Sequence, residues 1–239
     1  TEIGAKDVPS LRLMTCSTAP LSPEQWRQFE EMYGVTLLQL YGMSEAGWIC
    51  GNRHYKRQMG TVGPPAKHQE FLIIDSDGNS CATGSEGEVS IGGPQTCIAT
   101  ISPDGEWEDQ RSIRMRTGDL AIIDEEGFVR VTGRTKDLII RGGVNIAPLE
   151  IDNVLMRHPK IREAAAIGVP DKIYGEEIVC YIVIKTGETL TENEVLEHCQ
   201  LNLPEFKVPK FVYQIDSLPK SDRGKILRDN LKVIWNKKN

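Results

Sequence analysis

The stretch GRTKDLIIRGGVNIAPLEID, residues 133–152, marks the point where the character of the chain changes. Before it, short apolar runs such as FLIID and LAIID are joined by turns containing Asp and Gly, a pattern typical of antiparallel hairpins. After it, β-forming runs alternate with helical segments, which is typical of an α/β domain. Gly133, Arg134 and Lys136 open the stretch as a polar connector, so we expect a domain boundary there.

The chain is therefore predicted to have a mixed α/β (α+β) fold, with a β-rich subdomain over 63–135 and a smaller α/β domain over 136–239. In residues 1–62, Ser22 and Gln25 form a capping-box pattern for a helix over 22–33, which Gly34 ends. The run VTLLQL, 35–40, is predicted to be a buried strand that leads into a loop, YGMSEAG.

In the α/β domain, Pro148 opens a predicted helix that runs to about His158. Two strands, AAAIGVP and EIVCYIVIK, flank a predicted PDKIYGE loop. Thr191 and Glu194 form a capping box for a helix to about Asn202. KFVYQI is predicted to be another strand, and a last short helix follows Lys225.

The composition is that of an ordinary globular chain, with 239 residues, 39% of them hydrophobic and 26% charged. The longest apolar run, 178–184, has seven residues. Because a membrane helix needs about 20, no membrane span is expected. The chain shows no signal peptide and no initiator Met, so we expect a processed chain or one cut from a longer polypeptide.

The formal net charge of −6 argues against a nucleic-acid-binding surface. The charge is uneven, since residues 203–239 carry nine Lys or Arg against four Asp or Glu. This basic end is either a solvated face or a contact for an anionic ligand such as a phosphate. The six cysteines form no CxxC pair and the four histidines no HExxH pair, so we expect free thiols in the reducing cytoplasm and no zinc site.

Four polar, glycine-bearing segments lie at the ends of predicted elements. They are STAPL (17–21), YGMSE (41–45), RTGDL (116–120) with GRTKD (133–137), and PKSDRGK (219–225). In YGMSE, the ring of Tyr41 offers a stacking face and Gly42 lets a ligand approach the backbone. The Ser44 hydroxyl and the Glu45 carboxylate suit a phosphate and a hard cation such as Mg²⁺. The alternative is a polar turn at a strand end.

The other segments also allow two interpretations each. Asp119 could accept hydrogen bonds from both hydroxyls of a ribose or simply end a turn. Gly142 and Gly143 suit either the lining of a narrow channel or a hairpin turn. The cations of PKSDRGK either bind phosphate or keep a flexible loop soluble, and a lysine there would be suited to stabilise an oxyanion.

In this order and spacing, the segments LQLYGMSE, TGDL, GRTKDLIIRGGVNIAPLEID and LPKSDRGKILR resemble the adenylate-forming enzymes. These include acyl-CoA synthetases, 4-coumarate–CoA ligase-like enzymes, luciferases and the adenylation domains of peptide synthetases. The resemblance covers essentially the whole chain and corresponds to the C-terminal half of such an enzyme. It implies that 1–62 is the end of a nucleotide-binding subdomain, 63–135 a distorted barrel and 136–239 a mobile lid.

The resemblance also implies a role for each matching residue. The positions that match the family's ATP- and AMP-binding residues are Thr18, Ala19, Pro20, Tyr41, Gly42, Met43, Ser44, Asp119 and Arg134. Tyr41 would pack on adenine, Ser44 would contact the phosphate, and Glu45 would hold Mg²⁺. Asp119 would bind the ribose hydroxyls with help from Arg134.

The remaining roles belong to the lid. Lys136 matches the hinge of the family, and Gly142 with Gly143 matches the loop that lines the pantetheine tunnel of coenzyme A. Lys225 matches the lysine that stabilises adenylate formation. Asn145 stands where some members have a phosphate-contacting Arg, so the resemblance does not imply that contact for this chain.

The implied reaction joins a carboxylic acid to CoA through an acyl-adenylate, with release of AMP and pyrophosphate. One departure from the family is the absence of a Ser/Thr/Gly-rich phosphate loop ending in Pro-Lys. We therefore expect that an N-terminal half is missing and that these 239 residues alone are inactive. The alternatives are an adenylation enzyme that loads a carrier protein and a non-catalytic half-protein that only binds.

Overall fold

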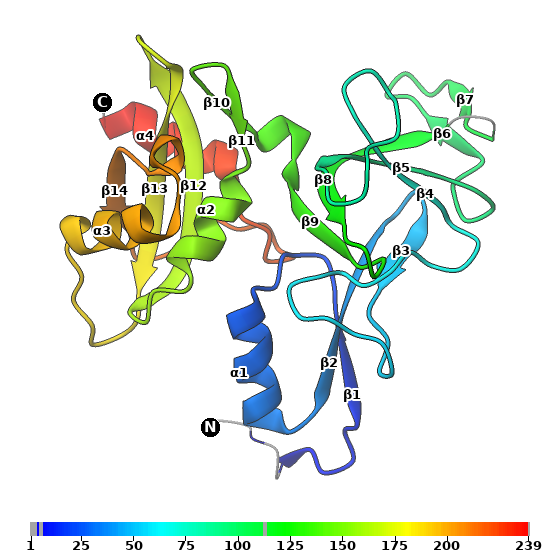
Figure 1. Ribbon diagram of the computed structural model, residues 1–239, viewed down its shortest axis with the longest axis horizontal. Coiled ribbons are helices and arrows are strands. Elements are labelled where there is room, and N and C mark those ends of the chain that lie inside the picture. The colour runs from blue at the N-terminus through cyan, green and yellow to red at the C-terminus, as the bar shows by residue number, and fades with distance from the viewer. Residues whose placement is uncertain (1–3, 5–6, 112–113, 239) are drawn as a thin grey trace. The chain divides into compact units, whose positions relative to one another are not determined.

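The computed structural model describes residues 4, 7–111 and 114–238, with the side chain of residue 238 left out (Figure 1). The chain divides into two units, Thr1–Thr132 and Gly133–Asn239. The sequence places this boundary at 135/136, three residues further along the chain. The predicted division of the first unit at 62/63 stays a prediction, and one buried cluster includes residues from both sides of it, such as Ile49 and Val89.

A small sheet and one helix begin the first unit. The strands are β1 (Leu13–Cys16), β2 (Thr36–Met43) and β3 (Gly47–Gly51), with β2 parallel to β1 and antiparallel to β3. Helix α1 (Pro23–Tyr33) joins β1 to β2, buries Trp26 fully and has the predicted capping box between Ser22 and Gln25. Gly34 ends α1 in the left-handed conformation, at φ 64°, so this predicted helix is confirmed.

The β-rich part of the first unit is antiparallel, as predicted. Its four-stranded sheet has the order β4 (Glu70–Ile74), β5 (Gly87–Gly92), β8 (Met115–Ile123), β9 (Val129–Arg134). A separate hairpin consists of β6 (Ala99–Ile101) and β7 (Trp107–Asp109). The buried side chains of Ile73, Val89, Ile91 and Ala121 form the core beneath the four-stranded sheet.

The second unit is a five-stranded sheet with helices on both faces (Figure 1). Its strands are β10 (Ile139–Arg141), β11 (Val144–Ile146), β12 (Ile161–Asp171), β13 (Gly175–Ile184) and β14 (Phe211–Gln214). Its helices are α2 (Pro148–Leu155), α3 (Glu192–Asn202) and α4 (Arg228–Lys238), with 3₁₀ turns η2 (Thr135–Asp137) and η3 (Glu205–Lys207). The alternation of helices and strands confirms the predicted α/β character of this unit.

The long hairpin of β12 and β13 is buried on both faces. Alternate residues point to opposite faces, so Ala166 and Cys180 join one buried cluster with α2 and α3. Ala165 and Tyr181 join another, with Leu231 of α4. This two-sided burial explains why both strands read as continuous apolar runs rather than as alternating ones.

Several predicted boundaries differ from the structure. Helix α2 ends at Leu155, three residues before the predicted end. Most of the predicted PDKIYGE loop is strand, because pairing continues to Asp171 and Gly175 and leaves only residues 172–174 between β12 and β13. Residues 41–43, predicted to be part of a loop, belong to β2 because they pair with β3.

All six cysteines are free, and Cys50, Cys180 and Cys199 are buried. Among the residues that the structure describes, no helix is both long enough and apolar enough to cross a membrane.

Candidate functional site

Two predicted segments lie just beyond the point where the parallel pairing of β1 with β2 ends in the first unit. Strands β1 and β2 are parallel, and Cys16 lies opposite Gln39 in their register. The predicted residues after β1 are Thr18, Ala19 and Pro20, and those after Gln39 include Tyr41. Thr18 has a φ of 82°, a left-handed conformation that is rare for a β-branched residue and marks a constrained turn. The carboxyl ends of parallel strands are a common place for ligands, so this region is a candidate site.

A hydrogen bond joins two of the predicted residues across the first unit. The Tyr41 hydroxyl donates to Asp119 Oδ2 at 2.6 Å, although the two residues are 78 positions apart. Burial and the neighbouring Asp119 carboxylate raise the pKa of Tyr41, so its phenol stays a neutral donor near pH 7. The structure therefore brings YGMSE and RTGDL together in one unit.

Asp119 is itself held in place by a buried side chain. The backbone N–H of Asp119 donates to Thr117 Oγ1 at 3.1 Å, and that hydroxyl donates to the carbonyl of Val89 at 3.1 Å. Thr117 is buried in β8, whereas Asp119 is half-buried. The Asp119 carboxylate is thus fixed on a strand of the four-stranded sheet, where it can receive hydrogen bonds from a ligand as well as from Tyr41.

The turn between β2 and β3 presents Ser44 and Glu45 to solvent. The N–H of Ala46 donates to the Met43 carbonyl at 3.2 Å, and Ala46 is buried beneath the turn. The Glu45 carbonyl accepts the N–H of Cys97 at 2.6 Å, which fixes the backbone and leaves the carboxylate outside. The two oxygen-bearing side chains are thus exposed, three and four positions after Tyr41 in the chain.

Gly42 is required by the close approach of β3. A Cβ at this position would lie 2.2 Å from the carbonyl oxygen of Gly47, at a register shift between the two strands. No side chain fits there unless the backbone of the turn moves. From the sequence, Gly42 is predicted to let a ligand approach the backbone. The structure shows that it is also needed for the close packing of β2 against β3.

We expect Gly42→Ala to lower the free energy of unfolding of the first unit by about 1–3 kcal/mol, because the added methyl group must displace backbone. The matched control is Gly92→Ala, since its Cβ would meet at 3.1 Å only the flexible end of Glu70. Urea unfolding of the 239-residue chain measures both. Equal stability of the two variants would contradict the packing role.

The other predicted residues belong to the second unit or to its start. Arg134 is the last residue of β9, and Lys136 lies in η2; both are exposed. Gly142 and Gly143 form the turn between β10 and β11, with φ values of 58° and 81°. Of the two readings of this glycine pair, the hairpin turn is therefore present, and the channel lining stays a prediction. Asn145 follows on β11, exposed and opposite Ile140.

Lys225 lies in a hydrogen-bonded hairpin, and the predicted flexibility of this segment stays a prediction. In residues 219–227, here called the lysine hairpin, the N–H of Leu227 donates to the Pro219 carbonyl at 2.9 Å. Within it, the N–H of Ser221 donates to the Lys225 carbonyl at 2.9 Å and that of Gly224 to the Ser221 carbonyl at 2.8 Å. These bonds fix the backbone on both sides of the exposed Lys225 side chain.

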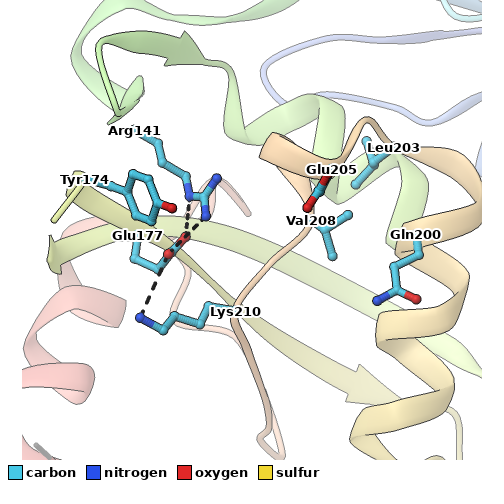
Figure 2. Close-up of a pocket in the computed structure, with 8 residues that line it drawn as sticks. All are labelled: Arg141, Tyr174, Glu177, Gln200, Leu203, Glu205, Val208 and Lys210. Atoms are coloured by element: carbon cyan, nitrogen blue, oxygen red, sulfur yellow. Dashed lines mark hydrogen bonds and ion pairs between the residues drawn. The ribbon is translucent and has the colours of Figure 1, made fainter.

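A pocket of about 630 Å³ lies beside the glycine turn, and sequence reasoning missed it (Figure 2). Glu177, nearly buried, accepts from Arg141 Nε at 2.6 Å, and the Arg141 guanidinium lies 4.4 Å from the centre of the Tyr174 ring. The Tyr174 carbonyl accepts the N–H of Gly142 at 2.8 Å, so this cluster supports the glycine turn. Arg141 and Glu177 are 36 positions apart, so no local sequence pattern predicts their ion pair, which forms only in the folded protein.

Two family models match the chain. Residues 2–98 match the model described as AMP-binding enzyme, and residues 150–225 match the AMP-binding enzyme C-terminal domain. A probable CoA ligase of Humulus lupulus, CCL9, is 39% identical over 92% of this chain. An oxalate–CoA ligase of Saccharomyces cerevisiae is 38% identical over 92%. The ATP-bound crystal structure of MatB from Rhodopseudomonas palustris matches 97% of the chain at 30% identity, with a TM-score of 0.87.

The match covers only part of each of these proteins. The chain spans 43% of the Humulus ligase, 41% of the yeast ligase and 47% of the MatB chain. The chain therefore spans about two fifths of the length of these curated relatives.

Proposed function

Because the chain belongs to the AMP-binding enzymes, we propose that it is part of an AMP-forming acid–CoA ligase. In the first half-reaction, a carboxylate oxygen attacks the α-phosphate of ATP, and the bond to pyrophosphate breaks. In the second, the thiol of CoA attacks the acyl carbon of the adenylate and AMP leaves. The names of the Humulus and yeast relatives support CoA as the acceptor.

The observation that carries this proposal is the hydrogen bond between Tyr41 and Asp119. It joins an aromatic ring, suited to stack on adenine, to a carboxylate suited to accept the hydroxyls of ribose. The two groups are the parts of a nucleoside site, and residues 18–20 follow the neighbouring strand β1 just beyond its pairing with β2. We assign Thr18, Ala19 and Pro20 to the adenine side of this site.

Ser44 and Glu45 would face the phosphates. Both side chains are exposed and carry oxygen donors, which are the ligands that Mg²⁺ prefers. The described residues include no group of three or more His, Cys, Asp or Glu side chains suited to a metal. One carboxylate with substrate phosphates is a usual set for Mg²⁺, so Glu45 fits. A Mg²⁺ bound there supplies positive charge that offsets the charge on the phosphates.

The second unit would supply a different group to each half-reaction. Lys225 would stabilise charge that develops on the α-phosphate as the adenylate forms. Gly142 and Gly143, which lack side chains, would let the pantetheine arm of CoA pass close to the backbone. We propose that Arg134 helps to bind the ribose. We propose that Lys136 is the hinge about which the second unit rotates between the two half-reactions.

The test of this function is ATP–pyrophosphate exchange with the native polypeptide that contains these residues. The acids should include oxalate, short, medium and long fatty acids and aromatic acids, because the names of the relatives do not agree on one acid. We expect exchange with one class of acid, and transfer to CoA rather than to a carrier protein in the second step. No exchange with any acid would contradict the proposal and favour a half-protein that only binds.

A further inference from the structure

The lysine hairpin is attached to one strand, β12, at both of its ends. At the first end, Lys220 Nζ lies 2.5 Å from Glu163 Oε2, in a partly exposed ion pair. At the second end, Arg228 begins α4 directly after the hairpin, and its guanidinium is directed to the same strand. The two attachment points on β12, Glu163 and Ala166, are three residues apart.

The attachment at Arg228 is a buried network of three residues. Arg228 Nη1 donates to the Ala166 carbonyl at 2.6 Å, and Nη2 donates to Asp152 Oδ2 at 2.5 Å. The other Asp152 oxygen, Oδ1, accepts the N–H of Ala166 at 2.6 Å. The side chains of Asp152 and Arg228 are only 6% and 14% exposed. A guanidinium that makes two charge-assisted bonds in a buried site has one orientation, so it fixes the backbone that carries it.

Ala166 explains why these two side chains meet here. Strand β12 is an edge strand of the sheet and pairs only with β13 among the described strands. Its outward N–H and C=O groups therefore need partners from outside the sheet. The Asp152 carboxylate of α2 accepts the N–H of Ala166, and the Arg228 guanidinium donates to the Ala166 carbonyl. Hydrogen bonds at this one residue therefore join α2, β12 and the start of α4.

We propose that Arg228 is a positioning residue for adenylate formation, holding the lysine hairpin at a fixed place on β12. Lys225 lies three residues before Arg228, and Leu227, between them, is bonded back to Pro219. A shift of the guanidinium would therefore move the hairpin as one body and displace the Lys225 ammonium. The inference rests on the role proposed above for Lys225. It adds that Asp152 and Arg228, which would not touch the substrate, determine where that lysine lies.

The experiment compares the two half-reactions in the native polypeptide that contains these residues. The variants are Arg228→Met and Arg228→Lys, assayed by ATP–pyrophosphate exchange and by acyl transfer from a presynthesised acyl-adenylate to CoA. We expect Arg228→Met to lower adenylate formation about 10- to 100-fold, the cost of a small misplacement, and to change acyl transfer less than about twofold. Arg228→Lys keeps the charge but replaces the planar fork, so we expect partial rescue.

Two controls separate positioning from loss of fold. Lys160→Met breaks a partly exposed ion pair with Glu194, at 3.6 Å, and a hydrogen bond to the Thr189 carbonyl, at 3.0 Å, in the same unit, and should leave both half-reactions unchanged. Hydrogen exchange on the 239-residue chain should show faster exchange of the amides of Gly224 and Leu227 in Arg228→Lys, with the amides of β13 unchanged. This second measurement reports on the hairpin even where Arg228→Met fails to fold.

The outcomes distinguish this inference from the proposed function. If Lys225→Ala leaves adenylate formation intact, the proposed role of the lysine is wrong, and the positioning role is wrong with it. If Lys225→Ala lowers it strongly but both Arg228 variants form adenylate normally, only the positioning role is wrong. Equal losses in both half-reactions, with unchanged hydrogen exchange in the hairpin, would also overturn it.

Discussion

Lys225→Ala is expected to lower the rate of adenylate formation about 10²- to 10³-fold, the cost of removing one preorganised donor to a developing oxyanion. The Lys225 side chain is exposed, and its backbone is fixed by hydrogen bonds within the lysine hairpin. The substitution therefore removes the charge without disturbing a core. Acyl transfer from a presynthesised adenylate to CoA should be spared. ATP–pyrophosphate exchange and the transfer assay, in the native polypeptide, measure the two steps separately.

Arg223→Ala is the matched control for this variant. It removes one positive charge from the same hairpin, two residues away and also exposed. Because an exposed charge is screened by water and salt, we expect only a small effect on adenylate formation. Similar losses in the two variants would mean that the hairpin acts through its net charge, and equal loss of both half-reactions would contradict the role of Lys225.

Asp119→Ala is expected to weaken binding of AMP and ATP about 10²- to 10⁴-fold. A hydrogen bond to a charged group contributes about 1.5–3 kcal/mol, and the carboxylate would receive two from the ribose. The substitution also removes the partner of the Tyr41 hydroxyl, which is 2.6 Å from Asp119 Oδ2. Isothermal titration of the native polypeptide with AMP measures the change in Kd.

Tyr41→Phe separates the contribution of the Asp119 carboxylate from that of its hydrogen bond to Tyr41, because this variant keeps the ring and removes only the hydroxyl. We expect this variant to weaken AMP binding less than about tenfold, the range of one hydrogen bond. An Asp119→Ala variant that binds AMP as tightly as the parent would exclude the ribose role. A Tyr41→Phe variant as weak as Asp119→Ala would mean that the carboxylate only orients the ring.

The helices could be predicted from local signals. The capping boxes at Ser22 and Thr191 are satisfied within four residues of chain, and both helices begin where the sequence places them. Strand ends could not be predicted in the same way. Tyr41 to Met43 are strand because β3 pairs with them, and that partner is not encoded in the five residues of YGMSE. The shortened loop at 172–174 has the same cause.

The candidate site was predictable as a set of residues but not as a set of contacts. Polar residues at the ends of predicted elements identify Tyr41, Asp119 and Lys225, although the structure places Tyr41 within β2 and Asp119 in the middle of β8. The bond between Tyr41 and Asp119 spans 78 positions, and that between Asp152 and Arg228 spans 76. Such pairs depend on how strands that are distant in sequence pair with one another. The hydrophobic periodicity of a single segment does not predict that pairing.

The side chains that meet at Ala166 have a further consequence, for the solubility of the protein. β12 is an edge strand of its sheet among the described residues, and the backbone groups of such strands can recruit strands from other molecules and start aggregation when they have no partners. At Ala166 both backbone groups are already occupied, so a foreign strand cannot form a continuous ladder along β12. The same two charged residues that hold the lysine hairpin thus protect this edge against intermolecular β-sheet growth.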